Sequence, residues 1–406
     1  MIGEQRLRPA LGALVLLAAL GIAALAVLPY PRWTPDGYAY AVRMLLDLGL
    51  PFQEALHRAQ AFYALQPIAA DPLQAPLFRG EQAPLYWDVF KPRVVYPFLC
   101  SLLFPNRGFQ GMHDVSSIAY VASAVAVYYL ALQFAGAIPS LVVTLGFAAF
   151  PGTIDLARCA QTDMLALLFS TLCLVALVRI VRDGGSRWPL LFAIAGLLLV
   201  FTRPAFYMLL GGSLGLCAGV WRGTPSRRNA ALACAGAAVA TTALYLGVAL
   251  ASGSPSFTYV IADARDIFFS TQPPDAERSF FSKLKGVLHF SADEPLGFWY
   301  AKMLVNLFFR ELARAVVTIF PLVAFFGLAT LRRDRAFWAL AGTVLALMLV
   351  PFLDPISLDM DRVLEFPMLP VLAIGLVGAA ASLQARLTDP NQGQVRKVIK
   401  KTSPGG

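Results

Sequence analysis

The stretch LGALVLLAALGIAALAVL, from Leu11 to Leu28, is followed directly by PYPRWTPDGY, which ends at Tyr38. An apolar run of about 20 residues is long enough to cross the hydrocarbon core of a membrane as a helix. No small-residue cleavage site and polar mature region follow it, so we expect a retained span rather than a removed signal peptide. Asp36 then lies at the rim of that span. A carboxylate is costly in hydrocarbon, which makes Asp36 a candidate functional group, although the N-terminus of a helix also explains it.

Composition indicates a polytopic membrane protein. The 406 residues are 58% hydrophobic and only 14% charged, and the mean hydropathy is +0.65, whereas soluble domains carry about 25% charged residues. The net charge of +9 does not indicate a nucleic-acid partner, because the basic residues lie in short loops and in the tail. The five cysteines form no CxxC pair, so they predict neither a disulfide framework nor a metal cluster.

The apolar stretches predict an all-α bundle of about ten transmembrane helices. We expect the spans at residues 10–29, 115–135, 137–152, 163–181, 188–202, 204–221, 229–252, 301–330, 336–353 and 362–386. Basic residues gather in a few places between them, at 6–8, 179–187, 222–228, 332–335 and 396–401. The positive-inside rule puts all of these clusters, and both termini, on the cytoplasmic side.

The apolar segment from Val94 to Phe104 is too short to count as a transmembrane span. About eleven residues at 1.5 Å each cover roughly 17 Å, whereas the hydrocarbon core is about 30 Å thick. We therefore expect it to lie along the outer leaflet or dip into it. Residues 30–114 then form one large external loop with two further surface helices, at 36–48 and 52–65.

The chain divides into three parts on this interpretation. Residues 1–221 form an N-terminal membrane module that contains the loop 30–114. Residues 222–386 supply C-terminal spans with a second external loop at 252–300, and residues 387–406 form a cytoplasmic tail that we expect to be disordered.

Acids and cations are both concentrated at the predicted external face. The acids are Asp36, Asp155, Asp163, Asp354, Asp359 and Asp361, and the cations are Lys91, Arg93, Arg158, Arg203 and Arg362. A lipid-phosphate substrate needs such a mixture. Cations hold the phosphate and stabilise its charge as it leaves, and a carboxylate accepts the proton of an attacking hydroxyl.

Each of these positions also has a simpler explanation. Arg203 lies between two apolar runs and either faces a protein interior or headgroup, or snorkels to the interface. Asp163 can cap the helix that it opens. Arg93 and Tyr96 can anchor a surface helix, and Arg362 can pair with the nearby acids.

The absence of several catalytic motifs disfavours some kinds of chemistry. The three histidines are far apart, and no HExxH, GxSxG or P-loop pattern occurs, which disfavours zinc, serine and nucleotide hydrolysis. A divalent cation, Mg²⁺ or Mn²⁺, that bridges Asp36 or Asp163 to a substrate phosphate stays possible, because such ions need only one or two protein carboxylates.

The order of these features resembles the GT-C superfamily of integral membrane glycosyltransferases, and most closely its bacterial branch that uses polyprenyl-phosphate sugars. The likeness covers about residues 1–220. It consists of an acid soon after the first span, a long external loop that contains Arg93-Val94-Val95-Tyr96-Pro97, and a second acid in Gln161-Thr162-Asp163. Members often carry a pair of acids in the first loop, whereas Gly37 follows Asp36 here.

The resemblance implies transfer of a sugar from a polyprenyl phosphate to a glycan, lipid or protein acceptor at the external face, with inversion. Asp36 is then the general base, and Asp163 positions the acceptor or a metal. Arg93 and Arg203 are phosphate ligands by placement, and Lys91, Tyr96, Arg158 and Arg362 complete the expected substrate-binding set. A bacterial inner membrane is the implied location, with the active site facing the periplasm or the cell exterior.

Three other functions stay open at this point. A transporter or flippase of lipid-linked sugars also needs charged groups in membrane segments, although it usually places them near the middle of the bilayer. A non-catalytic scaffold does not need several acids and arginines on one face. A glycan ligase that acts on lipid-linked sugars is a further possibility.

Overall fold

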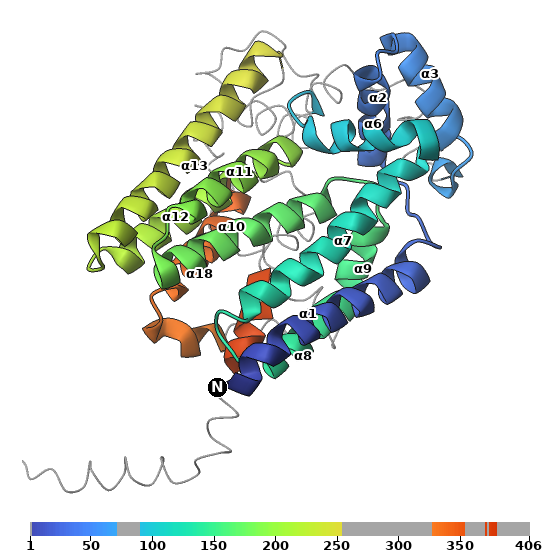
Figure 1. Cartoon of the computed structure of the whole chain (residues 1–406). Helices are drawn as coiled ribbons and strands as arrows, with labels where there is room; N and C mark the ends of the chain where they lie inside the picture. Colours follow the sequence, from blue (N-terminus) through green and yellow to red (C-terminus); the bar gives the residue numbers. More distant parts are fainter. Residues whose placement is uncertain (1, 71–89, 254–326, 354–369, 372, 380–406) are drawn as a thin grey trace, which may run out of the picture.

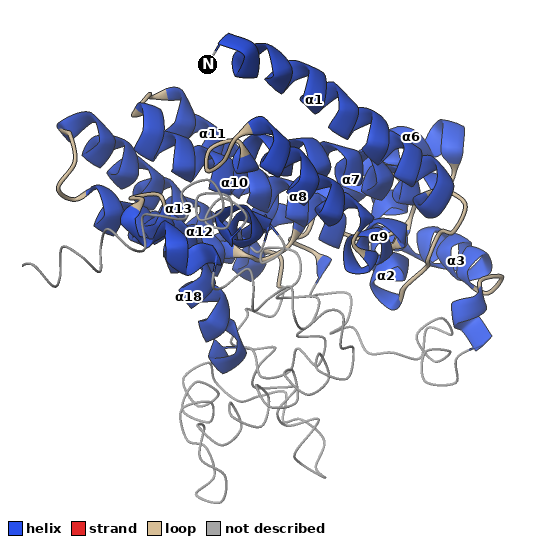
Figure 2. Ribbon diagram, turned by 90° about the horizontal axis from the view of Figure 1, so that it is seen from below, coloured by secondary structure: helices blue, strands red, loops and turns tan. Residues whose placement is uncertain are grey.

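The computed structural model describes residues 2–70, 90–253, 327–353, 370–371 and 373–379. The regular elements in these ranges are helices, and an isolated bridge between Arg32 and Cys159 is the β-type pairing among them. The helices pack into one bundle, with no strand drawn in the described part (Figures 1 and 2). The all-α prediction is confirmed for this part of the chain.

Four described helices are long and apolar enough to cross a membrane. They are α1 (Ile2–Ile22), which the π-helical turn η1 (Ala23–Val27) continues, α7 (Gln110–Ala131), α10 (Asp163–Asp183) and α13 (Pro225–Ala251). Helices α8 (Ala137–Ala149) and α9 (Pro151–Arg158) make a fifth span if the pair, bent by 53°, counts as one.

The ten-span prediction is therefore supported only in part. Helices α11 (Arg187–Thr202), α12 (Phe206–Val220) and α18 (Phe337–Leu353) lie at expected spans but are shorter, with fewer than 18 residues. The expected spans 301–330 and 362–386 fall mostly outside the described residues, as do the loop 252–300 and the tail 387–406.

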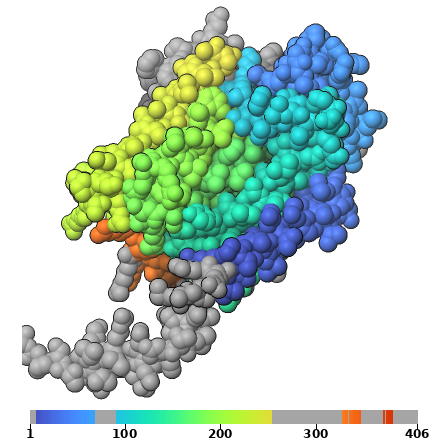
Figure 3. Space-filling model, in the orientation of Figure 1, coloured from blue at the N-terminus to red at the C-terminus, as the bar shows by residue number. Residues whose placement is uncertain are grey.

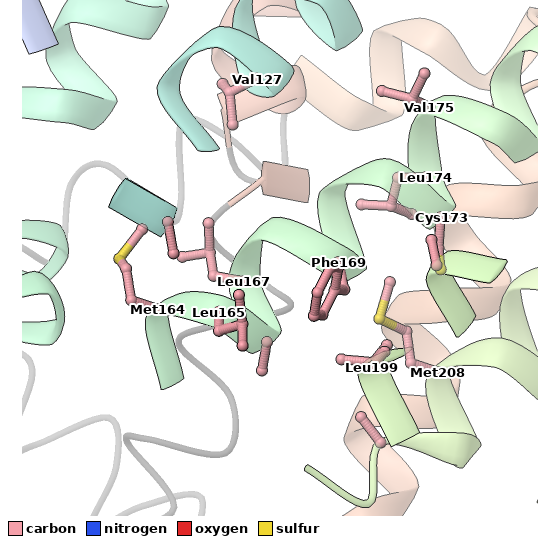
Figure 4. Close-up of a cluster of buried hydrophobic side chains, with 14 of the residues drawn as sticks. Val127, Met164, Leu165, Leu167, Phe169, Cys173, Leu174, Val175, Leu199 and Met208 are labelled. Atoms are coloured by element: carbon pink, nitrogen blue, oxygen red, sulfur yellow. The ribbon is translucent and has the colours of Figure 1, made fainter. Parts of the chain in front are cut away.

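Helix α10 forms the centre of the bundle. Its apolar window is 83% buried, whereas those of α1 and α13 are 22% and 28% buried. Figure 4 shows Met164, Leu167 and Phe169 of α10 packed among side chains of the neighbouring helices, including Leu199 and Met208. The peripheral α1 and its continuation η1 instead expose large leucines such as Leu17 and Leu25, as expected for a helix that faces lipid. The space-filling view shows α1 at one edge and α13 at the opposite edge (Figure 3).

Three short helices cover one end of the bundle, as predicted. They are α2 (Pro35–Asp47), α3 (Phe52–Tyr63) and α6 (Val95–Arg107), which lie together in Figure 1. The start of α2 follows from its sequence, because Thr34 Oγ1 accepts a hydrogen bond from Gly37 N at 3.1 Å and Pro35 occupies the first turn.

The basic loops gather at the other end of the bundle. Arg182 forms an ion pair with Asp334, and Arg227 donates to the carbonyl oxygen of Arg182 at 3.0 Å. Tyr128, near the end of α7, donates to the carbonyl oxygen of Arg8 at 3.3 Å. These contacts confirm that the clusters at 6–8, 179–187, 222–228 and 332–335 share one end. Their cytoplasmic placement stays a prediction.

Candidate functional site

A short backbone pairing brings the end of the first span to the beginning of α10. Arg32 N donates to the carbonyl oxygen of Arg158 at 2.8 Å, and Ala160 N donates to the carbonyl oxygen of Arg32 at 3.0 Å. These two bonds form the parallel bridge between Arg32 and Cys159. Asp36 and Asp163, which lie far apart in the sequence, therefore follow two paired stretches of backbone.

Gly37 allows the first turn of α2 to lie directly against this pairing. A Cβ atom at position 37 would meet the Ala160 carbonyl oxygen at 2.7 Å and the Tyr63 hydroxyl oxygen at 2.7 Å. Real Cβ atoms do not approach oxygen that closely. A side chain at position 37, such as that of a second acid after Asp36, therefore has no room in this chain.

Asp163 is fully buried and fully engaged. Its Oδ1 forms an ion pair with Arg203, whose side chain is 15% exposed, and its Oδ2 accepts a hydrogen bond from Gln161 Nε2 at 2.6 Å. A buried carboxylate needs such partners, because desolvation of an unpaired charge costs several kcal/mol. The structure thus brings Arg203 to Asp163.

Arg93 is held on the same end of the bundle by Tyr40. Its Nη1 donates to the Tyr40 hydroxyl at 3.1 Å, and that hydroxyl is 3.2 Å from Thr162 Oγ1. The guanidinium lies 4.8 Å from the ring centroid of Phe90, and Arg93 Nε is buried with no hydrogen-bond partner in the described part of the chain. Although burial opposes the charge, the neighbouring oxygens, including that of Asp36, raise the pKa of Arg93 above its ordinary value.

Asp36 lies in the first turn of α2, where the helix dipole favours a carboxylate. It is half-buried, in contrast to Asp163, and it is an electrostatic neighbour of both Arg93 and Tyr63. Burial raises the pKa of Tyr63 well above its ordinary value and that of Tyr38 to about 12. Both phenols stay neutral near pH 7, so neither competes with Asp36 as a proton acceptor.

An aromatic cluster from the later helices lies near Arg93. Tyr245 of α13 is an electrostatic neighbour of Arg93, and its ring centroid lies 5.7 Å from that of Phe201 and 6.5 Å from that of Phe206. Phe201 and Phe206 flank Arg203 in the sequence. Arg93 therefore lies near rings from the segment that carries Arg203.

The other predicted site residues have structural contacts. Arg158 Nε donates to the Ala26 carbonyl oxygen at 2.7 Å and lies 5.3 Å from the Tyr30 ring centroid. Tyr96 is buried and donates to the Met112 carbonyl oxygen at 2.8 Å. The exposed Lys91 reaches the Ser252 carbonyl oxygen at 3.3 Å.

One further acid of the sequence analysis is described, and it pairs with a neighbour on its own helix. Asp155 is exposed and 3.5 Å from Arg158. Asp354, Asp359, Asp361 and Arg362 lie outside the described residues.

Sequence reasoning missed three members of this group, Tyr40, Gln161 and Tyr245. A signal existed for Tyr40, which follows Asp36 by one helical turn on the same face of α2. Gln161 stood inside the motif that contains Asp163. Tyr245 carried no local signal, because only the packing of α13 brings it to Arg93.

The donors around Asp163 do not suit a divalent cation. Its two oxygens face a guanidinium and an amide N–H, which favour an anion rather than a metal ion. Among the described residues, no group of three or more His, Cys, Asp or Glu side chains is arranged to hold a metal. The expected bridging of a metal by Asp163 therefore does not fit the arrangement.

No protein-family model matches the chain, and no curated protein matches it with significant similarity. The assignment of a function therefore depends on the geometry of this group.

Proposed function

We propose that this chain is a membrane glycosyltransferase that moves a sugar from a polyprenyl phosphate to an acceptor hydroxyl, with inversion and with Asp36 as the general base. One observation carries the proposal. Asp36 is a half-buried carboxylate in the electrostatic neighbourhood of Arg93, whereas the other acid of the group, Asp163, is fully buried and paired with Arg203. The site therefore combines a partly accessible acid with two cations for an anionic leaving group.

The proposed reaction follows from these roles. The acceptor oxygen attacks the anomeric carbon as its proton passes to the Asp36 carboxylate, and the bond between that carbon and the phosphate oxygen breaks. The electron pair of the broken bond leaves with the polyprenyl phosphate. Arg93 and Arg203 stabilise the resulting charge. A phosphate is already a good leaving group, so this scheme needs no general acid.

The membrane setting supports a lipid-linked donor. Several helices of the described part are long and apolar enough to span a membrane, and the acids and arginines gather at the end of the bundle away from the basic loops. A polyprenyl chain in the bilayer would present its phosphate at that level. We propose that this end faces the periplasm of a bacterium, in keeping with the positive-inside rule.

The test is transfer of labelled sugar from a panel of polyprenyl-phosphate donors by purified protein. General base catalysis contributes about 10² to 10⁴ in rate, so Asp36→Asn should reduce kcat by that factor. Asp47→Asn is the matched control, because Asp47 lies on the same helix and pairs with Arg43 at 3.2 Å. Transfer by Asp36→Asn at the rate of the control would remove Asp36 from the mechanism. Movement of the donor across liposome membranes without sugar transfer would favour the flippase instead.

A further inference from the structure

We propose that Gln161 is a positioning residue, whose side chain fixes the N-terminus of α2, and with it the Asp36 carboxylate, against the ion pair of Asp163 and Arg203. This inference rests on the proposed role of Asp36 in sugar transfer. It assigns a function to an amide side chain that hydrogen-bonds to Thr34 and Asp163.

The contacts of Gln161 form one continuous chain. Thr34 Oγ1 donates to Gln161 Oε1 at 3.0 Å, and Gln161 Nε2 donates to Asp163 Oδ2 at 2.6 Å. The same Thr34 oxygen accepts the hydrogen bond from Gly37 N at 3.1 Å that begins α2. In the sequence, Asp36 lies between Thr34 and Gly37. Its backbone position is therefore tied through Gln161 to the first residue of α10.

Burial keeps water away from part of this chain of hydrogen bonds. Gln161 is 2% exposed and Asp163 is fully buried, so water is excluded from the bond between them, whereas the bond from Thr34 is partly buried. The backbone of Gln161 is also fixed, because its carbonyl oxygen accepts from Ser116 Oγ of α7 at 3.2 Å. An amide is the side chain that suits this place, since it accepts from a hydroxyl and donates to a carboxylate at once.

The first test replaces Gln161 with leucine, which has a similar size and makes no hydrogen bond. Misplacement of a catalytic group by about 1 Å can cost 10²-fold, so kcat should fall by about tenfold to a hundredfold. The KM for the donor should stay within about twofold, because no donor contact is removed. The matched control is Gln133→Leu at the other end of the bundle, where the glutamine also has two partners, Arg179 at 3.1 Å and the Tyr129 carbonyl oxygen at 3.0 Å.

A double variant of Gln161 and Asp36 distinguishes a positioning role from a merely structural one. In the Asp36→Asn background, Gln161→Leu should reduce kcat little further, because residues that act as a unit are not additive. An equal loss in both backgrounds, or a loss confined to KM, would overturn the proposal.

Thr34 gives a second route if Gln161→Leu does not fold. Thr34→Val keeps the shape of the side chain but removes the hydroxyl, so it should lower kcat as Gln161→Leu does. Thr34→Ser keeps the hydroxyl and should restore most of the activity. Equal kcat values for the valine and serine variants would contradict the proposal.

Amide hydrogen exchange tests the positioning without any donor. Exchange of Gly37 N–H should be faster in Gln161→Leu than in the wild type and in Gln133→Leu, because the cap of α2 loses its support. Unchanged exchange would refute the coupling whether or not the protein transfers sugar. Faster exchange in a protein that uses no donor of the panel would instead refute the proposed function alone.

Discussion

Arg203, the residue that follows α11, forms an ion pair with Asp163, the first residue of α10. Asp163 is fully buried, so this pair accounts for an arginine that lies between two apolar runs with no loop to solvate it. It also joins the ends of two adjacent helices, and Gln161 connects Asp163 to Thr34 at the start of α2.

Loss of one partner of this pair should destabilise the protein. Asp163→Asn leaves the Arg203 guanidinium with a neutral partner in a buried place, and breaking a buried pair in this way typically costs about 3–5 kcal/mol in the free energy of unfolding. Denaturation in detergent, followed by circular dichroism, measures the loss. The double variant Asp163→Asn, Arg203→Gln should recover at least half of it. Strict additivity of the two single variants would show that the ion pair is not energetically coupled.

A methyl group at position 37 should disturb the site. Gly37→Ala forces the start of α2 away from the Ala160 carbonyl oxygen, which a Cβ would meet at 2.7 Å, so we expect both lower stability and a lower kcat. In Gly21→Ala the new Cβ meets nothing within 4 Å, and the change should be neutral or stabilise the helix by up to about 1 kcal/mol. The melting temperatures and transfer rates of the two variants check the contrast, and equal behaviour would count against the close approach.

Replacement of Arg93 should affect the use of the donor. A hydrogen bond to a charged group is worth about 1.5–3 kcal/mol, so Arg93→Gln should lower kcat/KM for the polyprenyl-phosphate donor by about 10- to 100-fold. Arg43→Gln removes an arginine of α2 that pairs with Asp47 and should leave kcat/KM unchanged. Steady-state kinetics at several donor concentrations measure both, and an unaffected Arg93→Gln would remove Arg93 from the phosphate site.

Arg158 should act on stability rather than on substrate. Arg158→Met removes the hydrogen bond to the Ala26 carbonyl oxygen, and we expect a loss of about 1–3 kcal/mol in the free energy of unfolding with the KM for the donor unchanged. Arg58→Met, which removes an exposed pair with Glu54, should cost less than about 1 kcal/mol. A raised KM with unaltered stability would return Arg158 to the substrate-binding set.

Removal of divalent cations should not stop transfer, because the Asp163 oxygens face Arg203 and Gln161 rather than an open position. Transfer rates before and after EDTA treatment, with a wash into metal-free buffer, check this expectation. An activity that falls with EDTA and returns with Mg²⁺ or Mn²⁺ would show that a metal acts in the reaction through other residues.

The helices were predictable because local signals mark them. The sequence predicted a helix at 36–48, and α2 runs from Pro35 to Asp47. Apolar length predicted α7, α10 and α13 to within a few residues. The expected span 137–152 begins where α8 begins, but α8 ends at Ala149 because Pro151 disfavours a helical Phe150, and the chain bends by 53° there into α9.

The acids of the candidate site were predictable from the sequence, but their burial and their partners were not. Asp36 and Asp163 were both candidates, but only packing decides that Asp163 is buried against Arg203 while Asp36 is half-buried. The contact between Arg93 and Tyr40 needs α2 to lie against α6, and Tyr245 reaches Arg93 only through the fold of α13. Such relations depend on helix packing, which leaves no trace in the local sequence.

The π-helical turn from Ala23 to Val27 holds one residue more in each hydrogen-bonded ring than an α-helix does. Deletion of one residue within this turn would convert it into ordinary α-helix and would change the direction of the following chain little. Deletion of one residue in the α-helical part of the span would instead remove about 100° of rotation, and Arg32 would then miss its backbone partners at 158 and 160. The candidate site would in that case lose its alignment while every one of its side chains was still present.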